Sequence, residues 1–285
     1  MDIEFKEKTY EKYFGHELSL LTDVTYSPDQ CDEAVLGFDE AFFMPESWFW
    51  RYGPYVRHRR RGRLTGVQIE DFNRHGKLIA DHLPPFKFNL FVQFKRPKFL
   101  ASNGAKQWSD WRRSYYRYET TPHQQEALEE LDAHSHGRAA TIYASPAFWQ
   151  ASALWSIVKR KSVVAQSNIA SVGKLKGHRH YTYAEPGCFG KGHSEAVDIE
   201  GETLVQIIER GIERNEPIPL NQHLKKAALA ITETVRQSDS ASSIFNQVQS
   251  ARGYSDFDQN SLYDSIEVIN AFSEAFGVRY YAVGR

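Results

Sequence analysis

The stretch FNLFVQFKRPKFL, residues 88–100, constrains the fold more than any other part of this 285-residue chain. Apolar residues occupy positions 88, 90 and 92 on one face of an expected strand, while Phe91, Gln93 and Lys95 occupy the other. Two long polar side chains, side by side on a strand otherwise apolar enough for a core, are costly without partners. The pattern therefore predicts a buried strand with a functional polar pair, Gln93 and Lys95.

The rest of the chain predicts a mixed α/β core followed by helices. A helix is expected over the first 22 residues, with Glu17 unusually placed on its apolar side. Strands are expected at 34–44, 88–95, 114–120 and 139–148, and a helix at 121–131. Residues 45–85 and 161–200 are expected to be loop-like. Beyond residue 201 the pattern is helical, and residues 278–284 form a terminal strand.

The net charge of −1 hides a strong asymmetry, because residues 51–117 contain 16 Lys/Arg and 4 Asp/Glu, a net +12. Basic clusters of this kind are typical of proteins that bind polyanions, although a run such as RHRRRGR is also found in solvated loops. We expect contacts to nucleic acid from the following residues: Arg57, Arg59, Arg60, Arg61, Arg63, Arg96, Lys98, Arg112 and Arg113.

Four residues on successive core elements suggest metal-dependent phosphodiester cleavage: Glu17, Asp39, Gln93 and Lys95. Mg²⁺ prefers hard oxygen ligands, and a lysine beside it stabilises charge that develops on the phosphate. Each residue also has a simpler interpretation. Glu17 would be a helix-edge cap, Asp39 would end a strand with Glu40 as the relevant acid, and Gln93 and Lys95 would face solvent on an edge strand.

These residues resemble the motif of the PD-(D/E)XK nuclease superfamily, in the Mrr-like variant with Gln-x-Lys on the third strand. The resemblance covers roughly residues 5–150, with Asp39 in GFDEAFF and Gln93 and Lys95 in FVQFK. The gap between Asp39 and Gln93 exceeds the usual hairpin, so a basic aromatic insertion at about 45–85 is required.

The resemblance implies a restriction endonuclease-like α/β core, a mixed sheet flanked by helices, in residues 1–200, with a helical C-terminal region in 201–285. It implies that Asp39, with Glu17, holds Mg²⁺ or Mn²⁺, and that Gln93 and Lys95 complete the catalytic site. Gln124 or Gln125 would be an auxiliary polar residue. Nucleases of this type cut double-stranded DNA, often in bacterial restriction or antiviral defence together with a partner subunit, and we expect the same here, with a homo-oligomer as a further expectation.

Several alternatives stay open at this stage. The same fold can bind DNA or a partner protein with an idle site, and the basic residues do not distinguish RNA from DNA. His178, His180, Cys188 and His193 could bind Zn²⁺, although their spacing matches no common zinc module. The order of residues in GCFGKGHS differs from that of a nucleotide-binding phosphate loop.

Location is predicted from what the sequence lacks. Two cysteines, Cys31 and Cys188, do not make a disulfide framework, which indicates a reducing compartment. No signal peptide or apolar run of membrane-spanning length is recognisable. We therefore expect a cytoplasmic protein without a membrane anchor.

Overall fold

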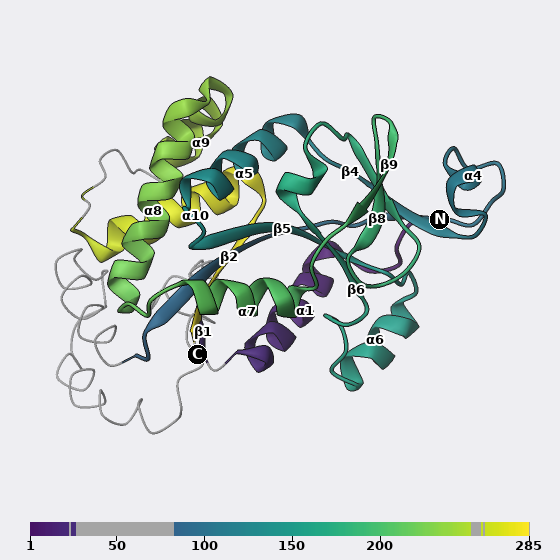
Figure 1. The fold of residues 1–285 in the computed structure, drawn as a ribbon, viewed down its shortest axis with the longest axis horizontal. Coiled ribbons are helices and arrows are strands. Elements are labelled where there is room, and N and C mark those ends of the chain that lie inside the picture. Colours follow the sequence, from purple (N-terminus) through teal and green to yellow (C-terminus); the bar gives the residue numbers. More distant parts are fainter. Residues whose placement is uncertain (23, 27–82, 252–257, 259, 285) are drawn as a thin grey trace, which may run out of the picture.

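The fold is mixed α/β, with two sheets and helices on both sides of the first (Figure 1). It is described by a computed structural model that covers residues 1–22, 24–26, 83–251, 258 and 260–284. The first sheet has five strands in the order β1-β10-β2-β5-β6. Its strands are β1 (Val24–Tyr26), β2 (Phe86–Phe94), β5 (Ala139–Pro146), β6 (Ser167–Ser171) and β10 (Arg279–Gly284).

The first sheet is mixed, because β2 runs parallel to β5 while β10 pairs antiparallel with both β1 and β2. All but one of the nine β2 residues are buried, as expected for a strand with neighbours on both edges and helices on both faces. The terminal strand predicted at 278–284 is confirmed, and it lies inside the sheet. The C-terminal strand β10 therefore shares one sheet with the N-terminal strands β1 and β2.

Helices cover the two faces of this sheet in separate sets (Figure 1). One face is covered by α1 (Glu7–Leu21), whose Phe14 ring lies 5.2 Å from that of Phe94, and by α7 (Leu204–Arg214), whose Gly211 lies against Phe88. The opposite face is covered by α5 (Pro122–His134) and α10 (Leu262–Phe276), with Phe272 6.3 Å from Phe91. The helices α8 (Leu220–Gln237) and α9 (Asp239–Ala251) pack with α5 and α10.

Local sequence explains where several of these helices begin and end. Pro122 occupies the first turn of α5, where its missing N–H costs nothing. Thr203 and Gln206 form a capping box at the start of α7. Ser261 caps α10, which ends at Gly277 in the left-handed conformation (φ 63°).

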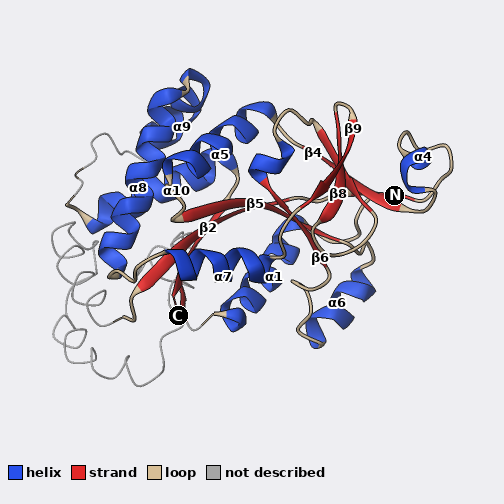
Figure 2. Ribbon diagram, viewed as in Figure 1, coloured by secondary structure: helices blue, strands red, loops and turns tan. Residues whose placement is uncertain are grey.

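The second sheet is antiparallel, with five strands in the order β3-β4-β7-β8-β9 (Figure 2). They are β3 (Lys98–Leu100), β4 (Tyr115–Glu119), β7 (His180–Tyr183), β8 (Phe189–His193) and β9 (Ala196–Glu200). One face packs a group of buried tyrosines toward β5: Tyr116, Tyr118, Tyr181 and Tyr183. Between β3 and β4 lies the short helix α4 (Trp108–Trp111).

The second sheet corrects one prediction and refines another. Residues 161–200 are not loop-like, because they contain β6, β7, β8, β9 and a short 3₁₀ helix at Val172–Leu175. The strand expected at 114–120 exists as β4 but belongs to the second sheet. The helix α6 (Ala151–Lys159) follows β5.

Candidate functional site

The candidate site lies where the parallel strands β2 and β5 end. Gln93 and Tyr143 are neighbours in the register of these strands, and the backbone N–H of Lys95 donates to the carbonyl of Ala144, 2.9 Å away. In α/β sheets, ligands bind beyond the carboxyl ends of parallel strands. The polar pair on β2 therefore stands at the end of the sheet where a ligand site is expected.

The side-chain amide of Gln93 is fixed on one side and unpaired on the other. Its side chain is 4% exposed. Nε2 donates to Gln124 Oε1 at 2.8 Å and to the carbonyl of Phe276 at 3.3 Å. Because a backbone carbonyl can only accept, the nitrogen must face Phe276. Oε1 is left buried, without a hydrogen-bond partner in the described part of the chain.

Lys95 is a half-buried cation beside this amide. Its Nζ lies 5.3 Å from the centroid of the Tyr143 ring. Burial lowers the pKa of Lys95 to about 8, and the charge of Glu7 opposes this shift. Burial raises the pKa of Glu7, in the first turn of α1, while Lys95 lowers it. Lys95 and Glu7 thus form an interacting pair at the end of β2.

Two helix ends of opposite polarity meet at Gln93. Gln124 belongs to the first turn of α5, whose N-terminal end carries partial positive charge. Phe276 is the last residue of α10, whose C-terminal end carries partial negative charge. The first favours an anion and the second a cation, so the two helix ends suit a cation bound together with a phosphate.

The described residues supply only part of a magnesium site. Gln93 Oε1 is a hard oxygen donor with no other partner, which is the kind of atom that Mg²⁺ binds. However, the described residues contain no group of three or more His, Cys, Asp or Glu side chains that could hold a metal ion. A complete site would need carboxylates from outside the described residues.

Glu17 lies away from Gln93 and Lys95. Its carboxylate accepts a hydrogen bond from the backbone N–H of Val164, 3.0 Å away, in the connection between α6 and β6. It belongs to α1, on the face of the sheet opposite to the helices that hold Gln93. The expected convergence of Glu17 with the polar pair is therefore not observed, and Glu17 behaves as a carboxylate that satisfies a loop N–H.

Of the remaining candidate residues, some lie outside the described residues and the two glutamines lie within them. Asp39 and Glu40 lie outside the described residues, as do Arg57, Arg59, Arg60, Arg61 and Arg63. Of the two glutamines on α5, Gln124 is the one that contacts Gln93. Gln125 instead accepts from the Tyr143 hydroxyl at 2.7 Å and donates to the carbonyl of Val172 at 2.8 Å.

The described basic candidates follow β2 along the chain. Arg96 donates to the backbone carbonyl of Ile3, and Arg113 pairs with Glu185 at 2.6 Å. Lys98 and Arg112 are exposed. Arg96 and Arg113 thus have structural partners, and Lys98 and Arg112 present their charges to solvent.

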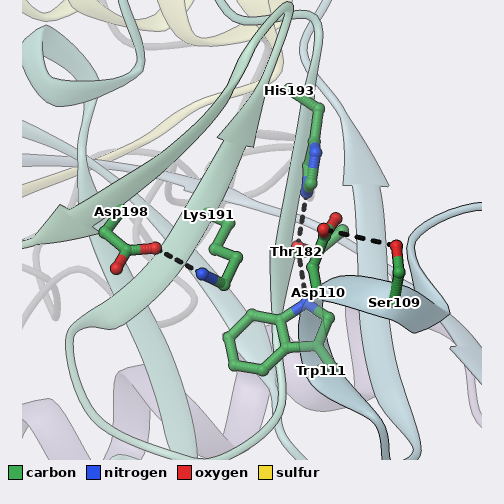
Figure 3. A network of polar contacts seen from close by, with 7 residues as sticks. All are labelled: Ser109, Asp110, Trp111, Thr182, Lys191, His193 and Asp198. Carbon is green, nitrogen blue, oxygen red and sulfur yellow. Dashed lines mark hydrogen bonds and ion pairs between the residues drawn. The ribbon is translucent and has the colours of Figure 1, made fainter.

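The histidines considered for zinc lie together on the second sheet but are engaged in other contacts. His193 Nε2 lies 2.8 Å from Thr182 Oγ1, and Trp111 Nε1 donates to the same hydroxyl at 3.0 Å (Figure 3). His180 lies 3.5 Å from Glu119, and His178 lies 3.3 Å from Ser194 Oγ. Burial lowers the pKa of His193, while Asp110 raises it.

Three contributors to the site were missed in the sequence. Glu7 precedes Tyr10 by three residues, so the helical spacing that drew attention to Glu17 also places Glu7 on the buried stripe. Tyr143 reaches Lys95 through the register of β2 and β5, and the Phe276 carbonyl arrives from the far end of the chain. No local sequence signal marks these two contacts.

Comparisons with protein-family models, with curated proteins and with solved structures find no match for this chain. None of the helices in the described part of the chain combines the length and apolar character that a membrane crossing requires. The fold and the site thus define a mixed α/β protein with a buried amide and a lysine at the ends of parallel strands.

Proposed function

We propose that the protein is a metal-dependent DNA endonuclease with a restriction endonuclease-like core. One observation carries the proposal: Gln93 presents an unpaired amide oxygen beside the half-buried Lys95, at the carboxyl ends of two parallel strands. An unpaired buried acceptor and a poorly solvated lysine each cost stability, and their placement together at this end of the sheet supports a ligand site there.

The residues of the chain have separate roles in this proposal. Gln124 and the Phe276 carbonyl hold the Gln93 nitrogen, which leaves the oxygen as the part of the amide that can bind a metal ion. Lys95 places its ammonium near the scissile phosphate, where it stabilises the charge of the transition state. Glu7 keeps Lys95 protonated, because its charge opposes the effect of burial on the lysine pKa.

A bound Mg²⁺ or Mn²⁺ would polarise the phosphate and lower the pKa of an attacking water. Among the described residues, Gln93 Oε1 is the donor that suits it. Asp39 is the carboxylate that the resemblance assigns to this role together with Glu17, whose carboxylate instead accepts a hydrogen bond from the Val164 N–H, and Glu40 is a possible auxiliary acid beside Asp39. Action on double-stranded DNA within a restriction or antiviral system, with a partner subunit and in the cytoplasm, belongs to the same proposal.

A second candidate is a nuclease-fold subunit with an idle site, which binds DNA or a partner protein. It is favoured by the lack of a metal-holding group among the described residues. The two candidates differ in one measurable property, because only the first predicts cleavage that depends on both a divalent cation and Lys95.

The test is a plasmid-cleavage assay with Mg²⁺ on wild type, Lys95→Ala and the matched control Lys159→Ala. Lys95→Ala is expected to cut roughly a hundred- to thousand-fold more slowly, since a single transition-state contact typically has this effect. Lys159 is an exposed lysine at the end of α6, outside the basic segment 51–117, so Lys159→Ala should cut at close to the wild-type rate.

A thermal melt of each variant separates loss of catalysis from loss of folding. Lys95→Ala should melt close to wild type, because removing a half-buried polar side chain opens no apolar cavity. Cleavage by Lys95→Ala at the wild-type rate would remove Lys95 from the mechanism. A wild type that never cuts, with DNA binding intact, would favour the idle subunit.

A further inference from the structure

Tyr143 is the aromatic side chain next to the polar pair of the candidate site. It belongs to β5 and is the register neighbour of Gln93 in the adjacent parallel strand β2 (Figure 1). Neighbours in register project from the same face of a sheet, and so does Lys95, two residues after Gln93. The Lys95 Nζ lies over the Tyr143 ring, 5.3 Å from its centroid. The two strands thus place the ring under the ammonium.

The ring attracts this ammonium electrostatically. The face of a tyrosine ring carries partial negative charge, and it attracts a lysine ammonium that lies within about 6 Å of its centroid. The attraction is stronger where water is excluded, and here the lysine is half-buried and the tyrosine fully buried. Because a lysine side chain is otherwise flexible, this contact limits the positions that its charge can take.

Gln125 holds the ring in turn. The Tyr143 hydroxyl donates to Gln125 Oε1 at 2.7 Å, inside the core. The Gln125 nitrogen donates to the carbonyl of Val172 and to the carboxylate of Glu129, both at 2.8 Å. Since a backbone carbonyl can only accept, the nitrogen must face Val172 and the oxygen must face the tyrosine. Burial raises the pKa of Tyr143, so the hydroxyl keeps the proton that it donates.

The adjacent glutamines at the start of α5 thus hold different parts of the site. Gln124 accepts from the Gln93 nitrogen, whereas Gln125 accepts from Tyr143. Gln125 is 7% exposed, and its other hydrogen bonds join it to the 3₁₀ helix at Val172–Leu175 and to the next turn of α5. One helix therefore orients the amide directly and the lysine through the tyrosine ring.

We propose that Tyr143 is a positioning residue, whose ring, held by Gln125, keeps the Lys95 ammonium in place at the end of β2. The inference rests on the proposed function, in which that ammonium stabilises the transition state of phosphodiester cleavage. Tyr143 acts on the reaction through Lys95, by fixing where the charge of the lysine lies.

The first measurement follows Lys95 itself and needs no cleavage. Reductive methylation of the full chain with ¹³C-formaldehyde gives each lysine a labelled dimethylammonium group that keeps its charge. The Lys95 signal is the one absent from the spectrum of Lys95→Arg. Because an aromatic ring shields groups that lie over its face, the Lys95 methyl protons should resonate upfield of those of exposed lysines. Wild-type Lys95 methyl protons at the position of exposed lysines would overturn the inference.

Two substitutions of Tyr143 separate the ring from its hydroxyl. Tyr143→Phe keeps the ring, so the upfield shift of Lys95 should stay. Tyr143→Met fills much of the same volume without an aromatic face, so the shift should be lost. Retention of the shift in a folded Tyr143→Met protein would show that another group holds Lys95, and would overturn the inference. If Tyr143→Met does not fold, the wild-type spectrum still decides, because it needs no substitution at Tyr143.

Tyr115 supplies a matched control. Like Tyr143, it is fully buried in a strand, and its hydroxyl donates to a glutamine, Gln107, 3.3 Å away. It belongs to β4 of the second sheet. Tyr115→Met should lower the melting temperature as Tyr143→Met does, since both remove a buried ring, but it should leave the Lys95 signal in place. Loss of the shift in Tyr115→Met as well would reduce the effect to general loss of packing and overturn the inference.

In a protein that cuts, kinetics provide the second measurement. Tyr143→Met should lower kcat roughly ten-fold, about the effect of a desolvated cation–π contact, with the KM for plasmid unchanged because Lys95 acts in the transition state. Tyr143→Phe should keep kcat close to wild type although it melts lower, since it leaves Gln125 Oε1 without its donor. A purely structural role of Tyr143 predicts instead that kcat follows the melting temperature, and that outcome would overturn the inference.

Failure of this inference is distinguishable from failure of the proposed function, because the Lys95 signal is measured without metal or DNA. An upfield shift that Tyr143→Met abolishes, in a protein that never cuts, would support the positioning of Lys95 by Tyr143 and remove the nuclease. Cleavage that depends on Lys95 but is indifferent to Tyr143→Met would keep the nuclease and overturn the role of Tyr143.

Discussion

The two ends of the Gln93 amide lie in different surroundings. The nitrogen satisfies both of its hydrogens on Gln124 and Phe276, whereas the oxygen is buried without a partner in the described part of the chain. Leaving a buried acceptor unpaired costs about 1–3 kcal/mol. A leucine or valine at the same strand position would avoid that cost, and a bound ligand that pairs with the oxygen would remove it.

His223 provides a prediction about pH at the level of a single residue. It is fully buried on α8, and burial, with a smaller contribution from Arg138, lowers the pKa of His223 to about 3 from an ordinary 6.5. Below about pH 6.5 His223 therefore binds a proton in the unfolded chain but stays neutral in the folded chain. Above that pH His223 does not lower the free energy of unfolding. As the pH falls from 6.5 toward 3, the free energy of unfolding decreases by on the order of a few kcal/mol.

The measurement is the urea midpoint of wild type and His223→Phe between pH 7 and pH 4. Phenylalanine cannot protonate, so the variant should lose less stability over this range, whatever its stability at pH 7. The exposed His16, changed to glutamine, serves as the control and should follow the wild-type curve. Parallel curves for wild type and His223→Phe would show that His223 does not resist protonation in the folded state.

At the scale of elements, the central position of β10 predicts that the N-terminal part cannot fold alone. β10 pairs with β1 on one side and β2 on the other. Without residues 201–285, Phe91 loses its ring contacts with Phe272 and Tyr280. A fragment of residues 1–200 is therefore expected to lack a cooperative urea transition and to bind the apolar dye ANS, unlike the full chain.

A cooperative transition in the fragment, with the near-ultraviolet circular dichroism of a packed aromatic core, would contradict this prediction. It would show that the first sheet closes without its C-terminal strand. The fragment is informative because residues 1–200 are the range that the sequence was expected to fold as the nuclease-like domain.

Sequence patterns predicted those elements whose burial is local and periodic. The helical pattern over the first 22 residues indicated α1, in which Tyr10, Phe14 and Leu18 are buried. The alternation around Leu90 indicated β2. The strands of the second sheet were missed over 161–200. Gly190 and Gly192 interrupt β8 because a Cβ at either position would collide with Tyr181 or His178, and neither ring is close in sequence.

The candidate site was predictable only in part, for a related physical reason. Gln93 and Lys95 carried a signal in the alternation of their strand, whereas Gln124 was suggested only by the resemblance, as one of two glutamines. Their contacts with Tyr143, Glu7 and Phe276 depend on the register of β2 and β5 and on how distant helices pack at the end of the sheet. These contacts join residues far apart in the sequence, so no local pattern predicts them. Glu17 is the reverse case. Its position on the apolar side of the helix suggested a site, but its carboxylate accepts a hydrogen bond from a loop N–H.

At the scale of the whole molecule, the charge asymmetry is the property most relevant to a nucleic-acid partner. Residues 51–117 carry a net +12 in a chain whose total is −1, so the remainder carries −13. Opposite charges of this size on one molecule orient it in the field of a polyanion and speed productive encounters. Residues 83–117 are the described part of this segment, and residues 51–82 lie outside the described residues.

The last prediction concerns the densest part of that segment, RHRRRGR at residues 57–63. Changing Arg59, Arg60 and Arg61 together to serine should weaken DNA binding for all sequences alike, because phosphate contacts carry no sequence information. If all three contact a duplex, the slope of log affinity against log salt should fall by roughly 2.7. The measurement is anisotropy at four salt concentrations, with two unrelated duplexes. Lys159, Arg160 and Lys161, changed to serine, form a control of equal charge outside the basic segment. An unchanged slope in the Arg59–Arg61 variant would show that these arginines do not contact phosphate, and the affinity would then have to come from other cations of the chain.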